Sequence, residues 1–231
     1  MEKESRSRTA IGVIARAPSA PGKTRLAPHL SDARLRSLRA ALVADVLHVV
    51  SAVEEVERFV FFTPDEADAE IAALARGSFT RRPQRGRDLG QRMRSAFEEL
   101  LIDRAYGSAI LMGSDIPLLT AAHVAAAREQ LQASEDIVLG PADDGGYYVI
   151  GLRTAESRLF DVIEWGTATV FSDTVAAATR FGLTPRIIQP AYDVDTIEDL
   201  RRLERDLTTA PSDVAPSTRA WFGAGWAGSA G

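Results

Sequence analysis

Residues 11–26, with the sequence IGVIARAPSAPGKTRL, decide the fold class. Their first six residues form an apolar run of strand length, and a polar loop follows it. Beyond the loop, residues 31–50 carry leucines and valines at three- and four-residue spacings, which is typical of an amphipathic helix. A buried strand, a loop and a helix in this order predict the first unit of an α/β domain.

The rest of the chain repeats this alternation. Strand-length runs at 59–62, 79–82, 109–112, 137–139, 147–152 and 186–188 alternate with helical segments at 65–75, 89–105, 120–132, 167–181 and 196–207. The Gly/Pro/Asp turn between 139 and 147 predicts an antiparallel hairpin. We therefore expect an α/β fold of three-layer αβα, Rossmann-like type, with a mixed but mostly parallel sheet covered by helices on both faces.

This domain is expected to span residues 11–207. Residues 1–10 are polar and are predicted to form a flexible N-terminus. The tail, residues 208–231, is rich in Ala, Gly, Ser, Thr and Pro and lacks a periodic apolar stripe. It is predicted to be flexible or packed on a partner, although Trp221, Phe222 and Trp226 could also pack on the domain itself.

Composition restricts the classes of function. The chain of 231 residues has a net charge of −5 and no cysteine, so thiolate metal sites and cysteine nucleophiles are excluded. A metal would need carboxylate ligands, which favour Mg²⁺ or Mn²⁺. An acidic protein with local arginine clusters suits a small anionic ligand better than a nucleic acid. With no secretory signal or membrane-spanning stretch, we expect a cytoplasmic protein without a membrane partner. Its oligomeric state is left open.

The loop after the first strand is a candidate phosphate site. Gly22, Lys23 and Thr24 suggest a P-loop, but Ala17 stands where that motif requires its first glycine. A strand-to-helix loop with two cations can still hold a polyphosphate through backbone N–H groups and charge. The alternative is a surface loop whose cations face water. The candidate nucleotide-binding residues here are Ala15, Ala17, Pro18, Gly22, Lys23 and Arg25.

Two aspartates are candidate metal ligands. Asp115, in GSDIP at 113–117, follows an apolar strand together with Ser114, and a carboxylate there can hold Mg²⁺ between nucleotide phosphates. Its alternative role is to cap local backbone amides. In DVDTIEDL at 193–200, Asp193 and Asp195 point to the same side if the chain is extended. Asp195 could instead cap the following helix.

Two further motifs supply candidate contacts to the nucleobase or the acceptor. DDGGYY at 143–148 combines carboxylates with glycines that let a ligand approach the backbone, although the same residues make a tight turn on their own. GRDLGQRM at 86–93 places an aspartate and a glycine at a helix start, where an ordinary N-cap is the alternative. The candidates from both motifs are Asp88, Gly90, Asp144, Gly145, Gly146 and Tyr147.

The order AP-x-x-GKTRLAP, DLGQRM, GSDIPLL, GPADDGGYYVIGL, W-x-T and DVDTIEDL resembles a bacterial family of glycosyltransferase-like or nucleotidyltransferase-like proteins, the DUF2064 type. That family has the nucleotide-diphospho-sugar transferase fold and is distantly similar to 2-phospholactate guanylyltransferases. The resemblance, over residues 11–207, implies that Asp115 and Asp195 hold the metal and that Lys23 and Arg25 contact a triphosphate. Thr167 lies in the W-x-T element, where Gly166 replaces the usual serine.

These features predict a metal-dependent nucleotidyltransferase. We expect Lys23, Arg25 and Asp115 to be catalytic, and an NMP to move from an NTP to a small acceptor with a phosphate, phosphonate or carboxylate group, releasing pyrophosphate. No protein nucleophile is needed for this reaction. Two alternatives are open: glycosyl transfer from a nucleotide-diphospho-sugar, and nucleotide binding without turnover.

Overall fold

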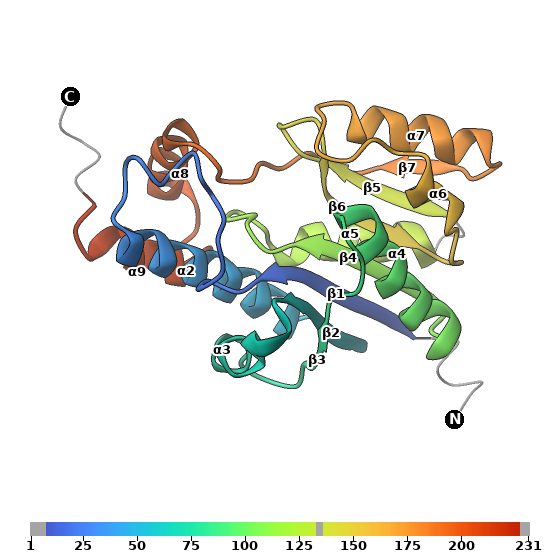
Figure 1. Cartoon of the computed structure of the whole chain (residues 1–231), viewed down its shortest axis with the longest axis horizontal. Helices are drawn as coiled ribbons and strands as arrows, with labels where there is room; N and C mark the ends of the chain where they lie inside the picture. Colours follow the sequence, from blue (N-terminus) through green and yellow to red (C-terminus); the bar gives the residue numbers. More distant parts are fainter. Residues whose placement is uncertain (1–7, 133–135, 227–231) are drawn as a thin grey trace.

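A computed structural model describes residues 8–132 and 136–226, and its centre is a seven-stranded sheet (Figure 1). The strand order is β3-β2-β1-β4-β6-β5-β7. All neighbouring strands are parallel except β6, which is antiparallel to both β4 and β5. The strands are β1 (Thr9–Arg16), β2 (Val56–Thr63), β3 (Thr80–Pro83), β4 (Ser108–Gly113), β5 (Ile137–Pro141), β6 (Tyr147–Leu152) and β7 (Pro185–Ile187). The mixed, mostly parallel sheet and the predicted hairpin are confirmed.

Helices cover both faces of the sheet. They are α2 (Asp32–Ser51), α3 (Asp68–Leu74), α4 (Leu89–Glu98), α5 (Ala121–Gln132), α6 (Arg158–Asp161), α7 (Val170–Arg180), α8 (Ile197–Thr209) and α9 (Pro216–Gly223). One apolar core joins α2, α3 and α5 to the sheet, and a second joins α4, α6 and α7 to its other face. A third core packs α2 against α8 and α9. The three-layer αβα arrangement is therefore confirmed.

The structure corrects three expected boundaries. Strand β1 begins at Thr9, and Thr9 and Ala10 are buried, so these two residues belong to the sheet rather than to a flexible terminus; residues 1–7 lie outside the described chain. The helix expected at 89–105 is α-helical only to Glu98 and continues as a π-helical segment, Glu99–Asp103. The helix expected at 167–181 begins at Val170.

As far as Trp226 the tail packs on the domain itself, which is the alternative that its aromatic residues offered to a flexible or partner-packed segment. Its helix α9 packs along α2, and Trp221 is 5% exposed. The carboxylate of Asp45 on α2 accepts hydrogen bonds from the backbone N–H groups of Ser217 and Thr218, both at 2.8 Å, and so caps α9. Residues 227–231 lie outside the described chain. In the parts described, no helix has the length and apolar character that crossing a bilayer requires.

Candidate nucleotide and metal site

An open cleft of about 810 Å³ lies at the carboxyl ends of the parallel strands. This is where ligands bind in open α/β sheets, because the strand order changes direction there. The cleft is lined by residues that follow β1, β2, β3 and β4 and by the β5–β6 turn. A smaller hollow of about 300 Å³ shares Arg16, Ser114, Asp115 and Asp195 with it and adds Gly22, Lys23 and Thr24. The candidate site residues that line the two hollows are Gly22, Lys23, Arg25, Ser114, Asp115, Asp144, Gly146, Tyr147, Thr167 and Asp195.

The backbone of the loop after β1 is held from behind by Arg39 on α2. Arg39 as a whole residue is 8% exposed, and its guanidinium donates to the carbonyl oxygens of Ala17 at 2.8 Å and Pro18 at 2.9 Å, and also to that of Ala20. Burial lowers the pKa of Arg39. The carbonyl oxygen of Ala15 accepts from Gln84 at 2.9 Å. Ala15, Ala17 and Pro18 are therefore buried and turned toward the protein, and they do not line the cleft.

Lys23 joins the first loop to the two predicted metal ligands. Its Nζ donates to Asp115 Oδ2 and to Asp195 Oδ1, each at 2.9 Å, and to the carbonyl oxygen of Val194 at 2.6 Å. The Lys23 side chain is 9% exposed, whereas those of Asp115 and Asp195 are 37% and 46% exposed. The backbone of Lys23 has φ 51°, a left-handed conformation that costs about 1–2 kcal/mol for a residue with a Cβ. The three contacts of Nζ help to offset that cost.

The capping arrangement of α8 leaves Asp195 available to a ligand. Thr196 is the N-cap, and its hydroxyl accepts from the N–H of Asp199 at 3.2 Å. The carboxylate of Asp199 accepts from the N–H groups of Thr196 and Asp195 at 2.8 and 3.1 Å. Because Asp199 and Thr196 complete the capping box, Asp195 is not the cap, and its side chain turns to Lys23 instead.

A third carboxylate joins the pair. Oxygens of Asp115, Asp193 and Asp195 all lie within 4.8 Å of one another. Burial and the charges of Asp115 and Asp195 raise the pKa of Asp193 to about 7. Burial would also raise the pKa of Asp115, but the charge and hydrogen bond of Lys23 hold it below its usual value. Clustered carboxylates that already surround one cation form a hard oxygen donor set, which fits Mg²⁺ or Mn²⁺.

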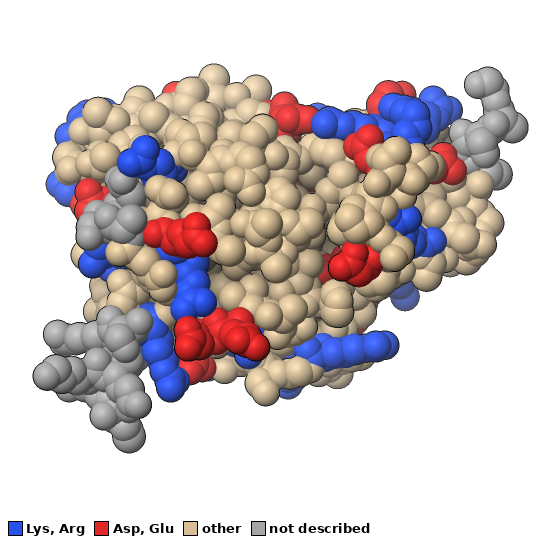
Figure 2. All heavy atoms as spheres, turned by 180° about the vertical axis from the view of Figure 1, so that it is seen from behind, with Lys and Arg blue, Asp and Glu red and all other residues tan. Residues whose placement is uncertain are grey.

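Arg25 and the arginines of residues 81–94 differ in their partners among the described residues. Arg25 is exposed on the cleft wall and has no hydrogen-bond or ion-pair partner among the described residues. The arginines of residues 81–94 mostly pair with acidic side chains, as in the ion pairs Arg81–Asp68, Arg82–Glu99, Arg85–Asp65 and Arg94–Glu98. On the face drawn in Figure 2, acidic and basic side chains are interspersed, without the single-sign surface that nucleic-acid binding favours.

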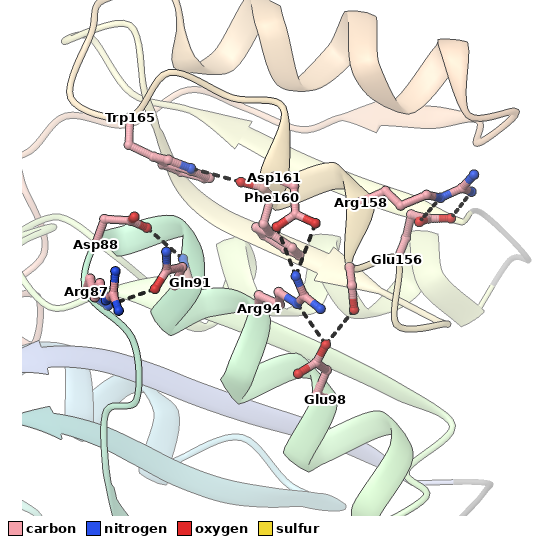
Figure 3. A network of polar contacts seen from close by, with 11 residues as sticks. Arg87, Asp88, Gln91, Arg94, Glu98, Glu156, Arg158, Phe160, Asp161 and Trp165 are labelled. Carbon is pink, nitrogen blue, oxygen red and sulfur yellow. Dashed lines mark hydrogen bonds and ion pairs between the residues drawn. The ribbon is translucent and has the colours of Figure 1, made fainter.

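Asp88 and Gly90 have structural contacts in this fold. Asp88 is the N-cap of α4 and accepts from the N–H of Gln91 at 2.8 Å (Figure 3), which is the alternative that the sequence offered. Gly90 lies against the indole of Trp165, and a Cβ there would stand 2.1 Å from Nε1 of that ring. Arg94 bridges Glu98 and Asp161 and so ties α4 to α6 (Figure 3). Neither Asp88 nor Gly90 lines the cleft.

The β5–β6 turn forms the opposite wall. Asp144 lines the cleft, and its Oδ1 accepts from the N–H of Gly146 at 2.8 Å. Gly145 has φ 88° and packs against Ala168, where a Cβ would lie 2.0 Å from the carbonyl oxygen. Burial raises the pKa of Tyr147, whose ring stands edge-on to Trp165. Thr167 lines the cleft, and its hydroxyl donates to the carbonyl oxygen of Glu164 at 2.9 Å.

Three residues of the site were not predicted from the sequence: Arg39, Gln84 and, as a metal ligand, Asp193. Arg39 follows Leu35 by four residues and precedes Leu42 by three, so a charge within the apolar stripe of α2 was the available signal. Gln84 is 9% exposed and also donates to the carbonyl oxygen of Phe61 at 2.9 Å. No pattern in the sequence distinguishes it from an ordinary residue after a strand.

Comparisons with known proteins agree with this fold. Residues 46–167 match the family described as "Uncharacterized protein conserved in bacteria (DUF2064)". A candidate nucleotide-diphospho-sugar transferase from Desulfovibrio desulfuricans is 31% identical, with a TM-score of 0.85 and coverage of 94% of this chain and 95% of that one. No protein of curated function is significantly similar.

More distant structures share the fold alone. A cytidylyltransferase from Leptospira borgpetersenii is 13% identical, with a TM-score of 0.59 and 94% of each chain covered. A CMP:2-keto-3-deoxy-manno-octonic acid synthetase in complex with CTP is 10% identical, with a TM-score of 0.55 and coverage of 87% of this chain and 99% of that one. The family match over more than half of the sequence and the 31% identity over nearly all of it lead to one conclusion: the chain belongs to the DUF2064 family.

Proposed function

We propose that this protein is a nucleotide-dependent transferase that moves an NMP from an NTP to a small acceptor with a phosphate, phosphonate or carboxylate group. The observation that carries the proposal is the meeting of Lys23, Asp115 and Asp195 at the carboxyl edge of the sheet, in a cleft that the exposed Arg25 also lines. Proteins of the same fold support it, since they include a cytidylyltransferase and a synthetase with bound CTP.

In the proposed reaction, an acceptor oxygen forms a bond to the α-phosphorus while the bond from that phosphorus to the bridging oxygen breaks. Pyrophosphate leaves with the bonding electrons, so the reaction needs no oxidant and no covalent enzyme intermediate. Arg25 and Lys23 would bind the β- and γ-phosphates and stabilise the charge that gathers on pyrophosphate. Arg16, on the wall shared by both hollows, is placed to assist them.

Asp115 and Asp195 would hold a Mg²⁺ or Mn²⁺ ion, with Asp193 as a third nearby carboxylate. A divalent cation there supplies positive charge to the phosphate oxygens. The carboxylates do not act as nucleophiles in this scheme. They would hold the cation, and through it the polyphosphate, next to the loop after β1. Positioning and charge stabilisation would account for most of the catalysis.

The β5–β6 turn is the proposed acceptor and nucleobase side. Asp144 is suited to a hydroxyl or amino donor, and Gly146 leaves the backbone open to close approach. The methyl and hydroxyl of Thr167 and the ring of Tyr147 complete that wall. Asp88, Gly90 and Gly145 would act through the helix cap and the close packing described above rather than by touching the nucleotide.

Glycosyl transfer is a second candidate, favoured by the 31% identity to a candidate nucleotide-diphospho-sugar transferase. The same carboxylates would then bind a cation that stabilises a nucleoside-diphosphate leaving group. The exposed Arg16 and Arg25, of which Arg25 has no partner among the described side chains, favour the triphosphate, because it has more negative charge to offset.

The test is an incubation with Mg²⁺, each NTP or each sugar nucleotide, and a panel of anionic acceptors, in which pyrophosphate and nucleoside diphosphate are assayed separately. We expect acceptor-dependent pyrophosphate that falls at least about 100-fold in Asp115→Asn. The matched control is Asp103→Asn, since Asp103 is an exposed aspartate at the end of the π-helical segment. Nucleoside diphosphate without pyrophosphate would establish glycosyl transfer, and nucleotide binding with neither product would establish a non-catalytic role.

A further inference from the structure

Lys23 is exceptional in the composition of this chain. Of 27 cationic residues, 25 are arginines and two, Lys3 and Lys23, are lysines. The Lys23 ammonium donates to the groups that would bind a metal: two carboxylates and the carbonyl oxygen of Val194, at 2.6–2.9 Å. The ammonium of Lys23 thus occupies the position where a divalent metal ion is expected.

The choice of lysine has a physical reason. An ammonium is a point charge with three N–H donors that can point to three separate acceptors, whereas a guanidinium is planar and presents its donors in a fixed fork. Asp115 and Asp195 come from different loops, and with Val194 they surround Nζ rather than presenting one carboxylate face. A point charge inside a cage of oxygens is also what a divalent metal ion supplies.

We propose that Lys23 is an internal cation that occupies the metal site while the protein is free of ligand and leaves it when a divalent cation enters. The proposal rests on the proposed function for its second half, in which the released ammonium binds the phosphates of the incoming nucleotide. Asp115 and Asp195 offer the ammonium the same carboxylates that the metal needs, so the two cations compete for them.

This competition couples the binding of the metal ion to the binding of the nucleotide. Without a polyphosphate, a metal ion that displaces Lys23 leaves the largely buried ammonium beside a second positive charge. A nucleotide removes that penalty, because its phosphates replace the lost carboxylates. Each ligand therefore strengthens binding of the other by the same factor, as thermodynamic linkage requires. The expected behaviour is weak metal binding alone and strong binding of the metal together with an NTP.

The experiment measures Mn²⁺ binding in the absence of nucleotide and acceptor, by the electron paramagnetic resonance signal of free Mn²⁺. Lys23→Met should bind Mn²⁺ at least about tenfold more tightly than the wild type, because the competing charge is gone. Arg36→Met is the matched control, since Arg36 is an exposed cation on α2, and its Mn²⁺ affinity should be unchanged. Equal or weaker binding in Lys23→Met than in the wild type would overturn the proposal.

A second measurement uses the wild-type side chain and does not depend on the variant folding. Lys3→Arg leaves Lys23 as the single lysine, so its ε-methylene gives one signal in protein labelled with ¹³C-lysine. Saturating Mg²⁺ alone should move that signal away from its position in the ligand-free protein, because the ammonium loses its two carboxylates, and an NTP added with Mg²⁺ should move it again. An unchanged signal with Mg²⁺ bound would contradict displacement.

Both measurements test the displacement of Lys23 independently of the proposed nucleotidyl transfer. Binding of metal alone is measured before any reaction is possible, so displacement can be established even if the protein transfers a sugar. Conversely, acceptor-dependent pyrophosphate together with no effect of Lys23→Met on Mn²⁺ affinity would keep the nucleotidyltransferase and remove the internal cation.

Discussion

Replacing Arg39 by methionine should destabilise the fold and disorganise the loop that precedes Lys23. Arg39 is buried, and its guanidinium donates to three backbone carbonyl oxygens, those of Ala17, Pro18 and Ala20. Hydrogen bonds from a charged donor contribute about 1.5–3 kcal/mol each. Burial of the charge cancels several kcal/mol of that sum, so the free energy of unfolding should fall by about 2–4 kcal/mol.

The assay is urea denaturation followed by tryptophan fluorescence, with Arg36→Met as the control. Arg36 is exposed on the same helix, so its replacement should change the free energy of unfolding by less than about 0.5 kcal/mol. In the folded variant, the dissociation constant of an NTP should also rise, because the loop carbonyls lose the group that fixes them. Equal stability of the two variants would refute the claim that Arg39 holds the loop.

Three further predictions concern stability. Gly90→Ala should lower the free energy of unfolding by about 1–3 kcal/mol, measured in urea, because its Cβ would collide with Trp165. Asp45→Ala should lower it by about 2–3 kcal/mol and detach α9, seen as faster amide exchange in that helix, since two N–H groups lose their acceptor. The hydrogen bond from Ser157, and then that from Arg94, lowers the pKa of Glu98 in the folded protein. The ionised carboxylate therefore stabilises the fold at pH values above the ordinary pKa of a glutamate, and this stabilisation is lost as the pH falls below that value. Thermal midpoints from pH 7 to 3 should therefore decline less steeply in Glu98→Gln.

The elements of the fold could be predicted because local periodicity determines them. The leucines and valines of α2 and the apolar runs of β1, β2 and β4 face the cores that their spacing indicated. The helix expected at 89–105 was partly wrong because its last turn widens into a π-helical segment, which the residue pattern does not reveal. Helix α9 was missed because it is held by Asp45 and by Trp221 against α2, which are contacts between distant parts of the chain.

The candidate site could be predicted as a set of residue types but not as a set of contacts. Lys23 and Asp115 are 92 residues apart, and Lys23 and Asp195 are 172 apart, so no spacing rule predicts that they meet. Because each of these three residues lies after a strand or just before a helix, the sequence did predict that they lie at the same edge of the sheet. What the sequence could not reveal is that the lysine lies between the aspartates instead of facing the solvent.

In the proposed reaction, the α-phosphoryl group of an NTP moves to an acceptor. The most direct test supplies the protein, Mg²⁺ and the active acceptor with an NTP that is ³²P-labelled at either the α- or the γ-phosphorus, and separates the products. For nucleotidyl transfer, we expect the α label in the acceptor product and the γ label in pyrophosphate. The opposite result is an α label that stays in the NTP, together with transfer of a sugar to the same acceptor in a parallel reaction that contains a sugar nucleotide instead of the NTP.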